Sequence, residues 1–384
     1  MILHLSTVAR TKAEDRVDYR YEDYAETGDR IHVTTQGVYF DVGLSAAVAL
    51  KGNFVYDSIS GATPLGPPYL PGTNAVNTAQ MSDQRYAGFL EPVIKWGNQT
   101  IMPQVSYSQE DDYQSLGIAL NDAIDFNEKN TTVTIGASHS FDYVLPNEGE
   151  YYYGTEGPLT QKLKKDSTEG LIGVTQLLGP NTVATADITV GYASGYLSDP
   201  YKRVLFDNVP YNPGPDPANP YPYTVWPERR PEEKLREVGF IGFQHYFDGV
   251  NGAMDLSYRF THDSWDVFSS TVALQWNQKI GKYVILSPMF RYYIQSAAWF
   301  YATHFPGDPD NATTYPLPSA YSSDYRLSSM ETFTGGITLS VRVQEHLSLD
   351  LQYQRYEMFG RDGVTQPVMY PKANVITGGF TVWF

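Results

Sequence analysis

The chain has 384 residues, 14% of them aromatic, no cysteine and a formal net charge of −16. The absence of cysteine excludes disulfides, thiolate metal sites and a cysteine nucleophile, and the negative charge argues against a nucleic-acid partner. No apolar run approaches the roughly 18 residues that a membrane-spanning helix needs.

Residues 1–15 precede the first predicted strand. Their apolar stretch is too short for a secretory signal peptide. We therefore expect a short periplasmic N-terminal segment over residues 1–15, with any signal peptide already removed or outside this numbering. The domain itself is expected over residues 16–384.

From residue 16 onward the dominant pattern is an alternation of apolar and polar residues with period two, which is typical of β-strands. Residues 131–144, 252–261 and 332–344 show it most clearly. Within 116–127, however, Asp122 falls on the otherwise apolar face, which predicts a bulge or a shifted boundary there. In chain order, predicted strands begin near residues 16, 30, 45, 84, 99, 115, 131, 167, 181, 235, 252, 268, 283, 328, 346 and 373.

The connections between these strands alternate between long and short. The long ones cover residues 58–83, 145–166, 195–233 and 298–325, and tight turns lie between them. Transmembrane barrels have two such unlike ends, with short periplasmic turns and long extracellular loops. The fold class predicted is therefore all-β, a transmembrane antiparallel β-barrel of about 16 strands in the outer membrane of a Gram-negative bacterium, surrounded by lipid and lipopolysaccharide.

The alternative is a soluble sandwich or propeller, which explains the period-two pattern equally well. It does not explain the asymmetric loops. A propeller should also show a repeat of about 40–50 residues, and the sequence has none.

The chain ends GGFTVWF, with Phe380, Val382 and Phe384 on one face of the last predicted strand. A terminal strand ending in phenylalanine resembles the signal that the barrel-assembly machinery reads in Gram-negative outer-membrane proteins. That resemblance implies the machinery as a partner.

A second resemblance rests on YRYEDYAETGDRIHV (19–33), VYDSISGATP (55–64) and SDQRYAG (82–88). These stretches are similar to the outer-membrane barrels of domain of unknown function 3570. The resemblance is best over residues 16–100 and implies fold and location, with no activity to transfer.

A barrel of 16 strands is wide enough for an aqueous lumen. Taking the polar face of each strand as inward gives charged residues of both signs, which could form a transverse field that selects permeants or could simply pair across neighbouring strands. The candidates are Asp18, Arg20, Glu22, Lys51, Glu91, Lys95, Asp125, Asp187, Asp255, Arg259, Arg291, Arg342 and Asp350.

The remaining negative charge falls on the loops, including residues 110–112 and Asp308, Asp310 and Asn311. Such loops could bind Ca²⁺, but no complete calcium loop is present, and a solvated acidic rim is the simpler interpretation. We therefore assign no metal and no cofactor. The adjacent His262, Asp263 and Ser264 cannot by themselves form a catalytic triad, because neighbouring strand residues point to opposite faces, and no enzyme activity is expected.

These observations favour a porin-like channel for passive passage of small solutes, constricted by the long loop at 195–233. The alternative is a structural sheath or docking barrel for a partner protein, such as a periplasmic or surface redox protein or lipoprotein. A loop folded inward favours the channel, and a loop held outward favours the docking barrel.

Overall fold

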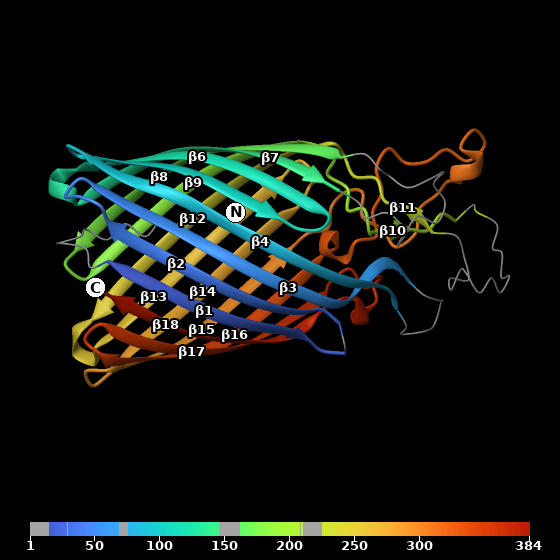
Figure 1. The fold of residues 1–384 in the computed structure, drawn as a ribbon. Helices are drawn as coiled ribbons and strands as arrows, with labels where there is room; N and C mark the ends of the chain where they lie inside the picture. Colours follow the sequence, from blue (N-terminus) through green and yellow to red (C-terminus); the bar gives the residue numbers. More distant parts are fainter. Residues whose placement is uncertain (1–14, 29, 69–75, 146–161, 208, 210–224) are drawn as a thin grey trace.

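The computed structural model describes residues 15–28, 30–68, 76–145, 162–207, 209 and 225–384. Its strands form a closed antiparallel barrel of 16 strands, and two short strands, β10 and β11, form a separate sheet. Figure 1 shows the strands crossing the barrel obliquely, with the long connections gathered at one end and the C-terminus at the other. No helix in the described part of the chain is long and apolar enough to cross a membrane.

Each barrel strand pairs with its neighbours in sequence, except that β9 pairs with β12 and the first strand closes the ring by pairing with the last. The barrel strands are β1 (Arg16–Glu26), β2 (His32–Gly43), β3 (Val48–Pro68), β4 (Val76–Trp96), β5 (Gln99–Gln109), β6 (Tyr113–Phe126), β7 (Thr131–Val144), β8 (Leu163–Gly179), β9 (Thr182–Gly195), β12 (Glu233–Phe247), β13 (Gly252–Asp263), β14 (Phe268–Ile280), β15 (Val284–Gln295), β16 (Met330–Gln344), β17 (Leu347–Gly360) and β18 (Lys372–Trp383).

The predicted strand order and the two unlike ends are confirmed, but one predicted connection is wrong. Residues 58–83 were expected to be a loop, whereas β3 and β4 are each 21 residues long and pair with each other over most of that range. The hairpin continues past the barrel rim because Pro64 and Leu65 are buried against the extracellular loops, where only 2% of the Leu65 surface is exposed. Burial against those loops, and not the period-two pattern, sets the length of these strands.

The outward face of the strands is apolar, as a surface in contact with lipid requires. Leu90, Ile135 and Ile188 each expose more than half of their surface. The inward face carries polar and charged side chains such as Asp57, whose Oδ1 accepts a hydrogen bond of 2.6 Å from Thr35 Oγ1. The barrel is therefore apolar outside and polar inside, the reverse of a water-soluble protein.

The extracellular connections pack on one another and form buried apolar clusters. Val204 and Phe206 of the segment after β9 contact Phe305 of the connection between β15 and β16, and β10 (Arg203–Val204) pairs with β11 (Trp226–Pro227). Gly66, at φ +127°, lies where a Cβ atom would come within 2.9 Å of the carbonyl oxygens of Arg203 and Ser323. Only glycine permits this close approach of three chain segments.

Candidate functional site

A cavity of about 630 Å³ lies at the extracellular mouth, between the wall of the barrel and the loop that follows β9. The turn between β5 and β6 supplies Glu110 and Asp112, β8 supplies Lys165, and β12 supplies Lys234. Tyr201 comes from the loop after β9. We call this cavity the vestibule.

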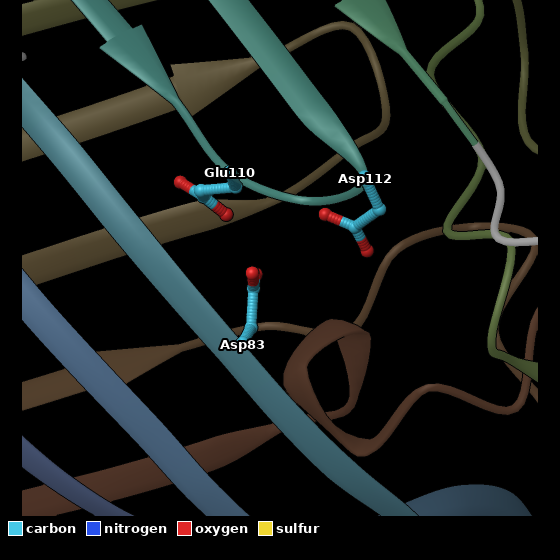
Figure 2. Close-up of side chains that lie close together, drawn as sticks. All are labelled: Asp83, Glu110 and Asp112. Atoms are coloured by element: carbon cyan, nitrogen blue, oxygen red, sulfur yellow. The ribbon is translucent and has the colours of Figure 1, made fainter.

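Three carboxylates converge beside the vestibule, and two of them, Glu110 and Asp112, line it (Figure 2). Asp83 comes from β4, and Glu110 and Asp112 come from the tight turn that joins β5 to β6; one oxygen of each lies within 4.8 Å of the other two. The turn is short because the backbone N–H of Glu110 donates to the carbonyl of Tyr113 at 2.7 Å. We call these three residues the acidic cluster.

The hydrogen bonds of the acidic cluster come from neutral donors. Asp83 Oδ1 accepts from the backbone N–H groups of Gln84 at 2.7 Å and Asp111 at 3.0 Å, and Asp112 Oδ2 accepts from the hydroxyl of Tyr201. No ion pair with a described residue involves any of the three carboxylates. The basic group that acts on Glu110 is Arg85, which lowers its pKa but is itself paired with Asp57.

Burial and the neighbouring carboxylates change the ionisation of this cluster. Burial first, and then the charge of Asp83, raises the pKa of Glu110 to about 7. Burial also raises the pKa of Asp112, against the hydrogen bond from Tyr201 that lowers it. The net charge of the acidic cluster therefore changes near neutral pH.

The basic side chains of the vestibule, in contrast, already have carboxylate partners. Lys234 lies 2.8 Å from Asp263 and its Nζ lies 4.1 Å from the centre of the Trp265 ring. Lys165 lies 3.8 Å from Asp142. Arg236 likewise pairs with Glu169. The charge that remains unpaired in the vestibule is consequently negative.

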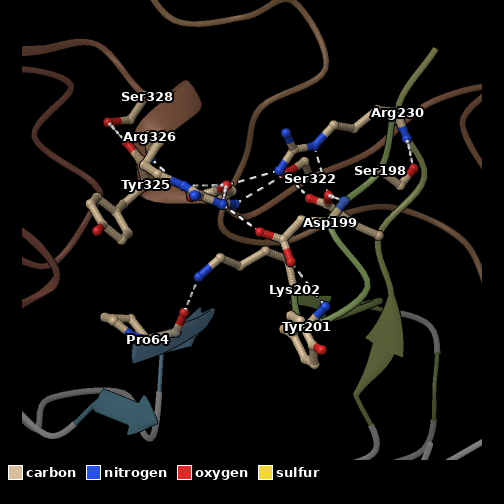
Figure 3. Close-up of polar contacts among 12 residues, drawn as sticks. Pro64, Ser198, Asp199, Tyr201, Lys202, Arg230, Ser322, Tyr325, Arg326 and Ser328 are labelled. Carbon is tan, nitrogen blue, oxygen red and sulfur yellow. Dashed lines mark hydrogen bonds and ion pairs between the residues drawn. The ribbon is translucent and has the colours of Figure 1, made fainter. Parts of the chain in front are cut away.

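At the wall of the vestibule, ion pairs join two connections that are far apart in sequence (Figure 3). Arg230, just before β12, contacts Glu228 at 2.6 Å and Asp324 at 2.8 Å. Arg326 contacts Asp324 and Asp199, both at 2.5 Å. Asp324 is fully buried and bridges the two arginines. We call Asp199, Glu228, Arg230, Asp324 and Arg326 the ionic lock.

The electrostatics favour the charged forms of Asp324, Asp199 and the two arginines, whereas burial raises the pKa of Glu228. Burial alone would raise the pKa of Asp324, but Arg326 and the neighbouring Lys202 hold it well below its usual range. Lys202 is itself buried, which lowers the pKa of its amine; its Nζ donates to the carbonyl of Pro64 at 2.5 Å. Through Lys202, the β3–β4 hairpin is attached to the same assembly.

The predicted lumen charges lie on the inward face, and several pair across strands. Arg20 contacts Asp350 at 3.0 Å, which in turn accepts from Ser340 at 2.5 Å, and Lys51 lies 3.7 Å from Glu91. Four further carboxylates of this group accept hydrogen bonds from neighbouring strands: Asp18 from Thr381, Glu22 from Thr377, Asp125 from Thr132 and Asp255 from Gln244.

The other lumen candidates do not form ion pairs with described residues. The guanidinium of Arg259 lies 5.4 Å from the centre of the Phe240 ring, and Phe240 is directly opposite Asp187 on the next strand. Arg342 donates to the carbonyl of Glu345 at 2.7 Å in a periplasmic turn. Lys95 and Arg291 face Thr100 and Thr334 on the neighbouring strands.

The predicted terminal strand is present as β18. Phe380 stacks on Tyr19 of β1 with ring centres 5.5 Å apart, and Phe384 exposes 64% of its surface. Thr381, which follows Phe380 in the chain, points inward instead, and its hydroxyl donates to Asp18. The three residues of the proposed assembly signal therefore share the outward face.

The other predicted features have ordinary roles. Asp308 accepts from the backbone N–H of Asp310 at 2.9 Å and caps the short 3-10 helix η3 (Pro309–Asn311). His262 contacts Glu237 at 3.2 Å, whereas Asp263 pairs with Lys234 on the opposite face of β13. Residues 208 and 210–224 of the predicted constricting loop lie outside the described residues, as do residues 1–14.

Sequence reasoning noted the acidic turn at 110–112 but did not identify Asp83 or the ionic lock. Asp83 was placed in a loop because the predicted β4 began too late. The lock joins residues 199, 228–230 and 324–326. The sequence does show charged residues inside loops that are otherwise rich in proline and tyrosine. A single sequence does not indicate which of these charged residues form ion pairs with one another.

The comparisons with known proteins agree with this architecture. The model of the family described as "Protein of unknown function (DUF3570)" matches residues 3–372. The chain belongs to this family. No curated protein matches it.

Among solved structures, the CdiB protein of Acinetobacter baumannii has a TM-score of 0.53 at 9% identity, over 97% of this chain and 60% of its own. The siderophore receptor PirA of A. baumannii has a TM-score of 0.44 at 12% identity, over 91% of this chain and 54% of its own. OccK5 (OpdH) of Pseudomonas aeruginosa has a TM-score of 0.45 at 8% identity, over 97% of this chain and 98% of its own. The DUF3570 chain thus spans little more than half the length of the first two. Such likeness concerns the fold, which is that of a Gram-negative outer-membrane barrel.

Proposed function

We propose that this DUF3570 protein is a porin-like channel for passive passage of small solutes, with a preference for cations. The observation that carries the proposal is the charge balance of the vestibule. Its lysines and arginines are paired with carboxylates, whereas Asp83, Glu110 and Asp112 have no cationic partner among the described residues. A wall of uncompensated negative charge raises the local concentration of cations and repels anions.

Below the vestibule, the inward face of the barrel offers a polar path. Charges of both signs line it, including the Arg20–Asp350 and Lys51–Glu91 pairs. Pairs of this kind keep a lumen wetted while they contribute little net field. Selection would therefore occur mainly at the mouth, where the charge is unbalanced.

The loop at 195–233 is proposed to narrow that mouth. Of its described parts, Tyr201 lines the vestibule, whereas Val204 is buried against Phe305 of the connection between β15 and β16, where β10 and β11 lie beyond the end of the barrel strands (Figure 1). Removing the loop should widen the entrance, because the wall opposite the acidic cluster would be lost.

The test is single-channel recording from purified protein in a planar bilayer, under a KCl gradient. We expect ohmic steps and a reversal potential that indicates cation preference. Glu110→Gln and Asp112→Asn should each reduce that preference. Asp111→Asn is the matched control, because it removes the same charge from the same turn at an exposed position outside the cluster.

Anion preference, or equal effects of Asp111→Asn and Asp112→Asn, would contradict the proposed selectivity. A barrel that stays silent after residues 197–231 are replaced by a short Gly/Ser link would exclude the channel. That outcome would support the alternative, a sheath or docking barrel for a periplasmic or surface partner protein, to be sought by crosslinking in native membranes.

A further inference from the structure

Asp122 places a carboxylate on the lipid-facing side of the barrel. The sequence predicted a bulge or a shifted boundary that would avoid this, but β6 pairs with β5 and β7 in unbroken register. Asp122 therefore stays on the same face as Leu120 and faces Ile101 and Ile135 on the neighbouring strands. Leu120 and Ile135 each expose 53% of their surface to the surrounding membrane.

This carboxylate has no partner among the described residues. Its Oδ1 is covered by protein and accepts no hydrogen bond. The other outward carboxylates of the described barrel strands all have one: Asp23 with His32, Asp166 with Lys164, Glu233 with Tyr192, Glu237 with His262, Glu331 with Tyr292 and Glu357 with Arg355. An isolated ionisable group in this position calls for a partner from outside the chain.

The depth of Asp122 indicates which membrane leaflet supplies that partner. Phe126 ends β6 four residues further on, at the end of the barrel that carries the short turns. At a strand rise of about 3.3 Å and a tilt of about 40°, this places Asp122 roughly 10 Å above the periplasmic end of its strand. A phospholipid headgroup of the periplasmic leaflet lies within reach of a side chain at that depth.

A second copy of the chain is a poor source of the missing cation. The lysines and arginines on the outward face of the described strands are Lys164, Arg355 and Lys372, and all lie towards the extracellular end. Lys164 and Arg355 are already paired, and Lys372 lies 5.1 Å from the centre of the Phe359 ring. Copies standing side by side in one membrane keep the same depth, so none of these lysines and arginines could meet Asp122. The outward His245, near the periplasmic end of β12, is hydrogen-bonded to Thr182 at 2.8 Å.

We infer that Asp122 binds the primary ammonium headgroup of a phospholipid in the periplasmic leaflet. The ammonium donates to the carboxylate oxygen that the protein does not cover, and the aliphatic side chains around it contact the acyl chains. These flanking side chains are Ile101, Leu120, Ile124 and Ile135. This inference concerns the outer wall and is independent of permeation through the lumen.

The experiment is native mass spectrometry of the detergent-solubilised full chain, titrated with three phospholipids of equal acyl length. They carry ethanolamine, choline or glycerol headgroups. We expect the wild-type protein to bind the ethanolamine lipid about tenfold more tightly than the choline lipid, which has no N–H to donate, or the glycerol lipid. Asp122→Asn should abolish this preference.

Asp125→Asn is the matched control, because Asp125 lies on the same strand but points inward and accepts from Thr132 at 2.8 Å. It should keep the preference for the ethanolamine headgroup. Equal binding of the three lipids by the wild-type protein, or an unchanged preference in Asp122→Asn, would overturn the inference. Crosslinking of Asp122 to another protein in native membranes, if it is lost in Asp122→Asn, would also overturn the inference. It would show that the partner of Asp122 is a protein and not a lipid.

Discussion

At the scale of single residues, Glu110 carries the clearest functional consequence. The residue stands in a three-residue turn beside two other carboxylates, and burial with the charge of Asp83 raises its pKa to about 7. A glutamate with an ordinary pKa would stay charged throughout the physiological range. Glu110 instead gains or loses its charge where small changes of environmental pH occur.

We therefore predict that cation preference depends on pH between about 6 and 8. A raised pKa means that Glu110 is protonated below pH 7 and charged above it, so the preference should rise with pH. Because the pKa of Glu110 is raised on folding, its protonated form also stabilises the folded loop slightly at low pH. This contribution is lost as pH rises through 7. Reversal potentials measured across this range should shift in the wild type and remain flatter in Glu110→Gln.

At the scale of elements, the ionic lock determines how the extracellular connections move. Removing one member of a buried ion pair leaves the other charge without compensation, at a cost of about 3 kcal/mol or more. Asp324 contacts two arginines with none of its side chain exposed. The segments around β10, β11 and η4 (Tyr325–Leu327) are thus expected to open together.

Asp324→Asn should loosen both loops while the barrel stays folded. Limited proteolysis of the protein in detergent should then cut near residues 199–230 and 324–326 much faster than in the wild type. Asp207→Asn provides the control, because Asp207 lies in the same loop with 60% of its side chain exposed. Equal protection of Asp324→Asn and the wild type would show that the apolar clusters alone hold the loops.

The lock should also resist mild acid. Asp324 has a depressed pKa, so its contribution is present above the ordinary aspartate value near 4 and is lost only as pH falls from there towards the folded pKa. Protease protection of the loops should accordingly be unchanged from pH 8 to pH 5 and decline below pH 4. Loss of protection at pH 6 would instead assign the holding role to a histidine.

At the scale of the whole molecule, closure depends on the contact between β1 and β18. These strands pair along their length, and Phe380 stacks on Tyr19 across the contact. Phe384, in contrast, is mostly exposed and adds only a backbone hydrogen bond of 2.9 Å to Asp15. Its side chain contributes little to the folded barrel, so any requirement for it belongs to assembly.

Replacing Phe384 by Ser should reduce insertion into the outer membrane several-fold without lowering the melting temperature of protein refolded in detergent. Heat-modifiable migration in gels measures insertion, and circular dichroism measures melting. Val364→Ser, at an equally exposed extracellular position, is the control. A matched fall in melting temperature for Phe384→Ser would assign the residue a structural role.

Most of the barrel could be predicted because period two is a local property. Strands such as β13 alternate cleanly, and the register then follows from which face meets lipid. The candidate site could not be predicted, because it depends on contacts between distant segments. Arg230 and Asp324 are 94 residues apart and belong to connections that the closed barrel brings to the same end. Asp83 reaches Glu110 only because β4 begins earlier than its pattern suggests.

The antiparallel seam between the first and last strands also restricts how this family can change in size. Gain or loss of a single strand would leave those two strands parallel and reverse the side on which one terminus emerges. Hairpins, in contrast, can be inserted or deleted while the seam is preserved. Family members of different length should therefore differ by an even number of strands. The inserted or deleted hairpin should lie between two periplasmic turns, or the length difference should lie within an extracellular loop.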